Sequence, residues 1–121
     1  MNTSPLIGVI DDDEDVRLSL EDLLLSLGYR AEAFPSADDF IERAASRPDC
    51  IISDIQMPGM NGIDLARYVR RTDPRLPVIL ITAFPNDDIS RQATEAGATS
   101  FLRKPFDPHN LISCLEAALC A

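Results

Sequence analysis

Three aspartates directly follow or end two short apolar runs. Asp11 and Asp12 come after LIGVI at 6–10, and Asp54 ends CIISD at 50–54. Two carboxylates about 4 Å apart repel by roughly 4 kcal/mol at an effective dielectric of about 20. A cluster of three is therefore costly unless the acids are protonated, neutralised or bound to metal. Mg²⁺ suits such a cluster because it uses one or two carboxylates, keeps several waters and completes its coordination with phosphoryl oxygens.

A hydroxyl and an ammonium end two further apolar runs. Thr82 closes the run VILIT, and Lys104 closes SFLRK. A lysine at a strand end is usually a solvated edge charge. Facing three acids, its ammonium instead suits a salt bridge to Asp54 or a bound phosphoryl group. The next residue, Pro105, is suited to a cis peptide bond that would aim the lysine into the site.

The other acids of the stretch GVIDDDEDVRLSL have a structural explanation. Asp13, Glu14 and Asp15 fall where the first turn of a helix should lie, and the helix dipole favours acids there. A calcium-binding loop does not fit, because its sixth position is Val16 instead of Gly and its twelfth is Asp22 instead of Glu. The functional interpretation therefore rests on the first two acids of the run.

Five apolar runs alternate with helical patterns along the chain, which is typical of a parallel α/β sheet. Right-handed crossovers place helices on both faces of such a doubly wound sheet, and ligands bind beyond the carboxyl ends of its strands. The polar residues that end the runs then share one edge of the sheet. The expected strands are 6–10, 31–34, 50–54, 78–82 and 100–104.

Turn and capping residues mark several helix ends. The first helix should end at Gly28, because glycine accepts a positive φ. The second should begin at Ser36, with Asp39 three residues later as in a capping box. The last should begin at Asp107, with Pro108 in its first turn. These residues locate the elements but assign no function.

Length and charge limit the classes of function. The 121 residues suffice for one domain, taken as 1–121, and the net charge of −9 argues against nucleic-acid binding by this segment. No apolar run approaches the roughly 20 residues that span a bilayer, and residues 1–10 lack signal-peptide features, so we expect a cytoplasmic protein. Cys50, Cys114 and Cys120 match no metal-binding spacing, and the first two are expected to be small core residues.

Four segments follow one another in a specific order along nearly the whole chain: VIDDDE at 9–14, SDIQMPGMNG at 53–62, LITA at 80–83 and EAGATSFLRKPF at 95–106. Together they resemble the receiver domains of two-component response regulators, with the FixJ-like subtype as the closest match. An Asp-Asp pair alone would be weak evidence, whereas the ordered set is specific. The resemblance implies a flavodoxin-like fold with five parallel strands in the order 2-1-3-4-5.

The resemblance also implies that Asp54 accepts a phosphoryl group from a phosphohistidine, carried by a sensor kinase or a phosphotransfer protein. Asp12 would bind Mg²⁺ directly and Asp11 would bind it through a water. Asp54 and the backbone carbonyl of Gln56 would be further ligands. This agrees with the chemistry of the residues, because phosphoryl transfer mainly requires alignment and charge neutralisation.

A conformational switch is the second implication of the resemblance. Thr82 and Lys104 would hold phosphoryl oxygens, with the Thr82 hydroxyl moving toward the phosphate while Phe101 rotates inward. The change would reach the surface formed by the fourth helix, the fifth strand and the fifth helix. The fourth helix, at 86–97, is weakly apolar, and a thinly packed element is suited to move. Its main buried candidates are Ile89, Ala93 and Ala96.

Two features depart from FixJ-like relatives. Phe84 and Pro85 follow the threonine segment, where those relatives commonly have Gly, small or polar residues. We hypothesise that Phe84 hinders water attack on the acyl phosphate; the alternative is a surface aromatic without a kinetic role. The chain also ends at Ala121, so we expect no output domain within it. It is either a stand-alone regulator or part of a longer protein with a DNA-binding output domain.

Three functions compete for this set of residues. A phospho-accepting switch uses all of them and is not an enzyme beyond slow self-dephosphorylation. A pseudo-receiver, which binds proteins without phosphorylation, is expected to lack an acid, the threonine or the lysine. A hydrolase with Asp54 as nucleophile would need a second acid two residues later, where the chain has Gln56. The sequence therefore favours the switch, and it leaves open the kinase, the regulated process and phosphorylation-dependent dimerisation.

Overall fold

Five short strands form one parallel sheet in the order β2-β1-β3-β4-β5, which confirms the expected fold. The structure is a computed structural model that describes residues 4–120; residues 1–3 and 121 of the expected domain lie outside the described residues. The strands are β1 (Leu6–Ile10), β2 (Arg30–Phe34), β3 (Cys50–Asp54), β4 (Val78–Thr82) and β5 (Ser100–Arg103).

Two strand boundaries differ by one residue from the prediction. β2 begins one residue earlier, at Arg30, because the chain there already pairs with the start of β1. β5 ends at Arg103, although the Lys104 N–H still donates to the carbonyl of Thr82 at 2.7 Å. Pro105 follows and has no N–H that could extend the ladder. Lys104 therefore lies immediately beyond its strand instead of within it.

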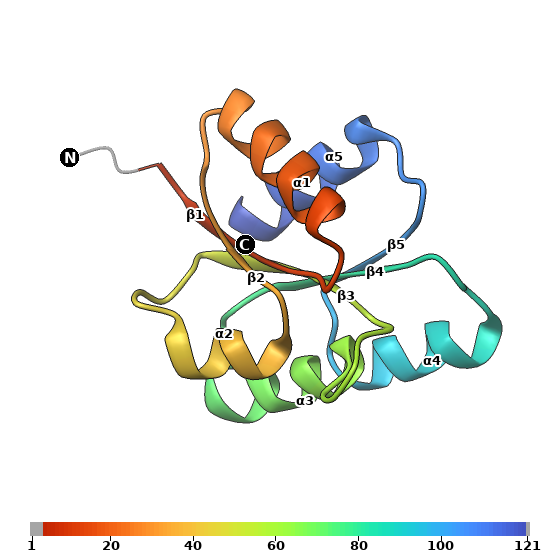
Figure 1. The fold of residues 1–121 in the computed structure, drawn as a ribbon. Coiled ribbons are helices and arrows are strands. Elements are labelled where there is room, and N and C mark those ends of the chain that lie inside the picture. Colours follow the sequence, from red (N-terminus) through yellow and green to blue (C-terminus); the bar gives the residue numbers. More distant parts are fainter. Residues whose placement is uncertain (1–3, 121) are drawn as a thin grey trace.

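Two layers of helices cover the sheet (Figure 1). The α1 and α5 helices lie on one face, and α2, α3 and α4 lie on the other, as right-handed crossovers require. The helices are α1 (Glu14–Ser26), α2 (Ala37–Arg43), α3 (Gly62–Thr72), α4 (Asp87–Glu95) and α5 (Pro108–Cys120).

Successive strand residues point to opposite faces of the sheet, and this gives the domain two cores. Ile7 and Val9 pack on the side of α1 and α5, whereas Ile10 packs on the side of the other three helices. β1, β3 and β4 are buried along their whole length, as their apolar runs predicted. In the core on the side of α1 and α5, the buried helix residues include Leu20, Leu24, Leu111 and Leu115.

The α4 helix has few apolar contacts. Ala93 is the buried residue within the helix, and Ala96 is buried directly after it. Ile89 is partly buried against the same core. These are the three residues predicted to anchor the helix, so α4 is held to the sheet by a narrow apolar strip.

Most of the predicted helix ends are confirmed. Gly28 has a φ of 89° just after α1, and the Ser36 hydroxyl accepts the N–H of Asp39 at 3.0 Å. The Asp107 carboxylate accepts the N–H of His109 at 2.8 Å, with α5 beginning at Pro108.

One expectation about the acidic run needs correction. Asp13 is the N-cap of α1 and not part of its first turn, because its carboxylate accepts the N–H groups of Asp15 at 2.9 Å and Val16 at 3.3 Å. Glu14 and Asp15 do lie in the first turn, where they complement the helix dipole. Capping by Asp13 and the helix dipole acting on Glu14 and Asp15 therefore explain these three acids.

The cysteines are thiols, and two of them lie in the core as expected. Cys50 is buried in β3, and Cys114 is partly buried against the same core from α5. Cys120 is exposed. Within residues 4–120, none of the helices combines the length and the apolar character that a membrane crossing requires.

Candidate functional site

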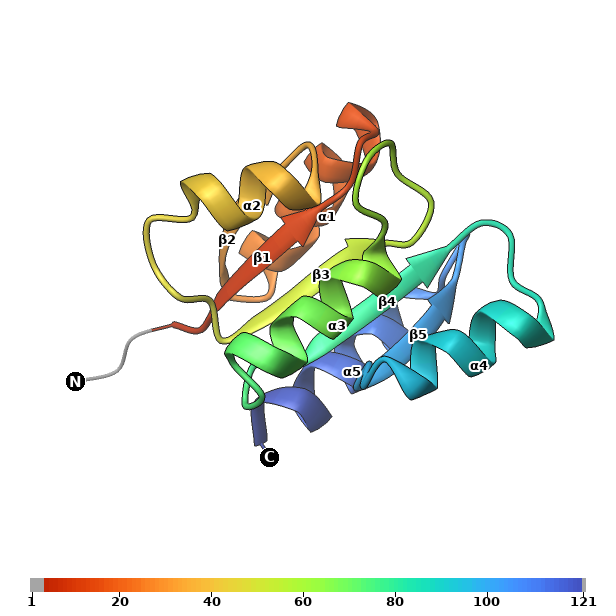
Figure 2. The same ribbon diagram turned by 90° about the horizontal axis from the view of Figure 1, so that it is seen from below.

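The carboxyl ends of β1, β3, β4 and β5 lie at one edge of the sheet, where their arrowheads point in Figure 2. Asp11 and Asp12 directly follow β1, and Asp54 is the last residue of β3. One carboxylate oxygen from each of the three acids lies within 4.8 Å of the corresponding oxygens of the other two. Parallel pairing of β1 with β3 brings together acids that are more than 40 positions apart in the chain.

Lys104 reaches this acidic cluster from the end of β5. Its Nζ lies 3.0 Å from Oδ2 of Asp11 and 3.5 Å from Oδ1 of Asp54. Asp11 is 1% exposed and Asp54 is 7% exposed, whereas Asp12 lies at the surface. The lysine therefore contacts Asp11 more closely than the expected partner, Asp54. The Lys104-Pro105 peptide bond is cis, as the sequence suggested.

Two groups of the cluster have perturbed acidities. Burial raises the pKa of the Asp54 carboxyl to about 6, and the neighbouring Asp11 carboxylate adds to this rise. The Lys104 ammonium and the N–H of Ile55 act in the opposite direction. Burial alone would lower the pKa of Lys104, but hydrogen bonding and charge from Asp11 and Asp54 raise it above its usual value. Lys104 therefore keeps its positive charge, and this charge compensates the negative charge of Asp54 only in part.

The donor set suits a hard divalent cation. Three carboxylates face a single ammonium, so the cluster keeps an excess of negative charge. Burial and, after it, the neighbouring Asp11 carboxylate raise the pKa of Asp54, and a cation beside the carboxylates would lower that pKa. Carboxylate oxygens are the ligands that Mg²⁺ and Ca²⁺ prefer, and the exposed Asp12 leaves one side open to water.

Thr82, the last residue of β4, is completely buried at the same edge. Its hydroxyl donates to Oε1 of Gln56 at 2.7 Å and accepts the N–H of Phe84 at 3.0 Å. The Gln56 side chain itself is exposed. The sequence assigned a binding role only to the backbone carbonyl of Gln56 and used its side chain only to argue against a hydrolase, whereas the structure connects that side chain to the threonine.

Phe101 lies on β5 and is not part of the acidic cluster. Its side chain is partly buried against the core on the side of α2, α3 and α4. Phe84 lies in the loop after β4 and is 70% exposed. The two aromatic residues are thus in different environments, because Phe101 packs against the core and Phe84 lies at the surface.

Two further residues support the acidic edge, and sequence reasoning did not assign them. Gly62 begins α3 so close to β3 that a Cβ there would lie 2.2 Å from the carbonyl oxygen of Asp54. Its N–H also donates to the carbonyl of Ile55 at 3.0 Å. Arg17 of α1 donates from Nη1 to the backbone carbonyl of Asp11 at 2.7 Å. In the sequence, Asn61-Gly62 indicates only a turn. The position of Arg17 on a helix does not indicate which group its side chain contacts.

The fold and the cluster together define a doubly wound α/β domain with an acidic, lysine-containing pocket at the carboxyl edge of its sheet. The family of response regulator receiver domains matches residues 7–116, and the chain belongs to this family. Receiver domains are parts of response regulators, so the chain is not a classical enzyme.

Relatives of known name support the same assignment. The chain is 36% identical over 115 residues to the DNA-binding transcriptional regulator NtrC of Escherichia coli K12, which covers 94% of this chain and 24% of NtrC. It is 33% identical over 120 residues to the transcriptional regulatory protein FixJ of Bradyrhizobium diazoefficiens, which covers 98% of this chain and 58% of FixJ. The chain thus spans about a quarter of NtrC.

Solved structures agree in fold over nearly the whole chain. The BeF3-activated receiver domain of DrrB superimposes with a TM-score of 0.91 at 27% identity, covering 98% of this chain and 100% of that one. The response regulator StyR superimposes with a TM-score of 0.85 at 36% identity, covering 98% of this chain and 60% of that one.

Proposed function

We propose that this domain is a phosphorylation-activated switch that accepts a phosphoryl group on Asp54 from a phosphohistidine. The observation that carries the proposal is the position of Asp54. It is nearly buried, contacts the Lys104 ammonium and lies within 4.8 Å of two further carboxylates, counted between ligand oxygens. In this environment a bound metal cation and the Lys104 ammonium can together neutralise the Asp54 carboxylate.

The transfer needs a carboxylate oxygen as nucleophile. An oxygen of Asp54 forms a bond to phosphorus as the phosphorus–nitrogen bond of the phosphohistidine breaks, and the electron pair of that bond returns to the imidazole nitrogen. The Lys104 ammonium and the Thr82 hydroxyl hold oxygens of the transferred group. The proposed assignment uses charge neutralisation and alignment, which are the main requirements of phosphoryl transfer.

Mg²⁺ is the proposed metal. Asp12 and Asp54 would bind it directly, Asp11 would bind it through a water, and the backbone carbonyl of Gln56 would add a ligand. When bound, the ion supplies positive charge that orients and neutralises the phosphoryl oxygens. The three clustered carboxylates support this choice, because Mg²⁺ typically combines few carboxylates with waters and phosphoryl oxygens.

A sensor histidine kinase or a phosphotransfer protein is the proposed donor. An apolar pocket of about 580 Å³ lies between α1 and the β5–α5 loop, and its lining includes Ala83 and Lys104. A donor protein docked on this surface would approach the mouth of the acidic site. The small side chain of Ala83 would leave room there for the phosphohistidine.

The wider setting is also proposed. Residues 1–121 form the receiver domain of a cytoplasmic regulator, which in a longer protein would be joined to an output domain. NtrC is by name a DNA-binding transcriptional regulator, so DNA binding is the proposed output in that case. Phosphorylation would change the surface of α4, β5 and α5, with Phe101 rotating inward, and that surface is the proposed face for a phosphorylation-dependent dimer.

Intact-mass spectrometry after incubation with acetyl phosphate tests the acceptor assignment. Wild type should gain the mass of one phosphoryl group with Mg²⁺ and none after chelation. Asp54→Asn should gain none, whereas Asp64→Asn, which changes an exposed acid of α3, should behave as wild type. Phosphoryl uptake by Asp54→Asn at the wild-type rate would refute the assignment. No gain in wild type under any condition would favour a pseudo-receiver that binds proteins without phosphorylation.

A further inference from the structure

The hydroxyl of Thr82 both donates and accepts a hydrogen bond within the domain. It donates to Oε1 of Gln56 at 2.7 Å, and it accepts the N–H of Phe84 at 3.0 Å. A threonine hydroxyl has a single proton and can therefore make one donor bond at a time. To donate to a phosphoryl oxygen, Thr82 has to release Gln56 first.

We propose that the Gln56 side chain is a latch that holds the switch hydroxyl in the unphosphorylated domain and sets how readily the activated state forms. The inference rests on the proposed phosphorylation at Asp54. Gln56 is a positioning residue in this scheme, because its amide acts through Thr82. The backbone carbonyl, which is the proposed metal ligand, is a separate group of the same residue.

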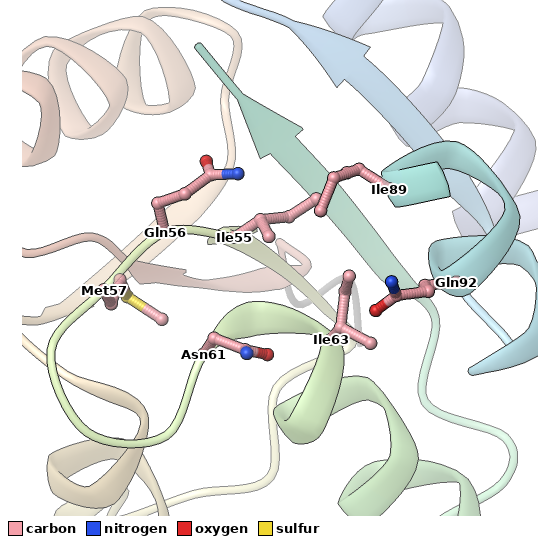
Figure 3. Close-up of a pocket in the computed structure, with 7 residues that line it drawn as sticks. All are labelled: Ile55, Gln56, Met57, Asn61, Ile63, Ile89 and Gln92. Carbon is pink, nitrogen blue, oxygen red and sulfur yellow. The ribbon is translucent and has the colours of Figure 1, made fainter. Parts of the chain in front are cut away.

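The surroundings of Gln56 allow such an exchange. A pocket of about 450 Å³ lies between the β3–α3 loop and α4, with Gln56 on the loop side and Gln92 on the α4 side (Figure 3). Gln56 is exposed, so after release its amide can bond to water, whereas the completely buried Thr82 hydroxyl needs a protein or phosphoryl partner. Both the Gln56 amide and the Thr82 hydroxyl therefore have hydrogen-bond partners before and after Thr82 changes its acceptor.

Gln56→Met tests the latch because methionine has a similar length and no acceptor oxygen. The bond to Thr82 is lost while the backbone carbonyl stays in place. We expect the variant to bind beryllium trifluoride, used as the phosphoryl mimic with Mg²⁺, about three to ten times more tightly than wild type, the range of one neutral hydrogen bond. The apparent affinity is measured by NMR titration of the adduct, at a Mg²⁺ concentration that saturates both the wild type and the variant.

Gln92→Met is the matched control. It makes the same substitution in the same pocket, but the Gln92 amide donates to Asp88 at 2.8 Å instead of contacting Thr82. Its affinity for beryllium trifluoride should equal that of wild type. A double-mutant cycle separates the latch from a general effect on packing. In a Thr82→Val background there is no hydroxyl to release, so Gln56→Met should add nothing.

The outcomes separate the latch from the switch itself. Equal affinities in wild type, Gln56→Met and Gln92→Met would overturn the latch and leave the switch intact. A tighter adduct that persists in the Thr82→Val background would also overturn it, because the effect would not pass through the hydroxyl. If wild type formed no beryllium trifluoride adduct in the presence of Mg²⁺, both the latch and the proposed function would be overturned.

Discussion

At the scale of single residues, the charge on Asp54 opposes folding when no cation is bound. Its carboxyl has a pKa of about 6 in the folded domain against an ordinary value of 3.8, mainly because of burial. Between these values the unfolded chain releases a proton that the folded domain keeps, so the Asp54 contribution to stability falls as the pH rises. Below both values the carboxyl is neutral in both states, and the penalty is absent.

Asp54→Asn should therefore be more stable than wild type in EDTA at neutral pH, by roughly 1 to 3 kcal/mol. The difference should shrink as the pH falls from about 6 and be lost near the ordinary aspartate value of 3.8. Urea unfolding across this pH range measures it. Equal stability of the two proteins at neutral pH would show that the folded domain does not penalise the charge.

Phe84 provides the second residue-scale prediction. Its ring is 70% exposed, while its N–H donates to the Thr82 hydroxyl beside the site. If the ring shields the acyl phosphate from water, Phe84→Ala should lose the phosphoryl group severalfold faster than wild type, as followed by intact mass over time. Leu25→Ala, at an exposed apolar position of α1, is the control and should not change the rate. Equal lifetimes in Phe84→Ala and wild type would identify a surface aromatic without a kinetic role.

At the scale of elements, the contact between α3 and β3 fixes the backbone of the acceptor aspartate. A Cβ on Gly62 would lie 2.2 Å from the Asp54 carbonyl oxygen, so Gly62→Ala requires backbone movement. We expect a loss of about 2 kcal/mol or more in urea unfolding and slower phosphoryl uptake.

Gly28→Ala is the control for this contact. Gly28 has a φ of 89° but no other group within 4 Å of an added Cβ, so only local strain results. We expect a loss of about 1 kcal/mol without a change in phosphoryl uptake. If Gly62→Ala took up phosphoryl groups at the rate of Gly28→Ala, the contact would not position Asp54.

The α4 helix should open more easily than α3. Ala93 is its buried residue, whereas α3 buries five residues: Gly62, Ile63, Leu65, Ala66 and Val69. Local stability follows buried apolar contact, so α4 amides should exchange with deuterium faster than α3 amides in the unphosphorylated domain. Hydrogen exchange followed by NMR measures this, and equal protection would argue against α4 as the mobile element.

At the scale of the whole molecule, the net charge of −9 governs which partners can approach. A phosphate backbone needs cationic contacts, so residues 1–121 should show no measurable binding to duplex DNA at physiological salt. Fluorescence anisotropy with a labelled duplex tests this. Binding that weakens with added salt would reveal a basic surface that the overall charge conceals, and DNA recognition would then not require a separate output domain.

The fold and most of the acidic edge were predictable from the order of residues along the chain. Apolar runs gave the strands to within one residue, since β2 and β5 differ only at Arg30 and Lys104. The acids were predicted to meet because parallel strands end at the same edge. The N-cap role of Asp13 was not anticipated, because the acidic run gives no sign of the residue at which α1 begins.

Sequence by itself determined the class of fold, because hydrophobic periodicity is carried by local residue types. Its ordered motifs identified the receiver family, and the residues that end the apolar runs identified the side chains at the edge. Only the tertiary structure decided that Lys104 lies closer to Asp11 than to Asp54, that Gly62 touches the acceptor strand and that Gln56 holds Thr82. These contacts join segments far apart in the chain. Their distances and burial set the charge balance and the hydrogen bonds, and no single segment contains that information.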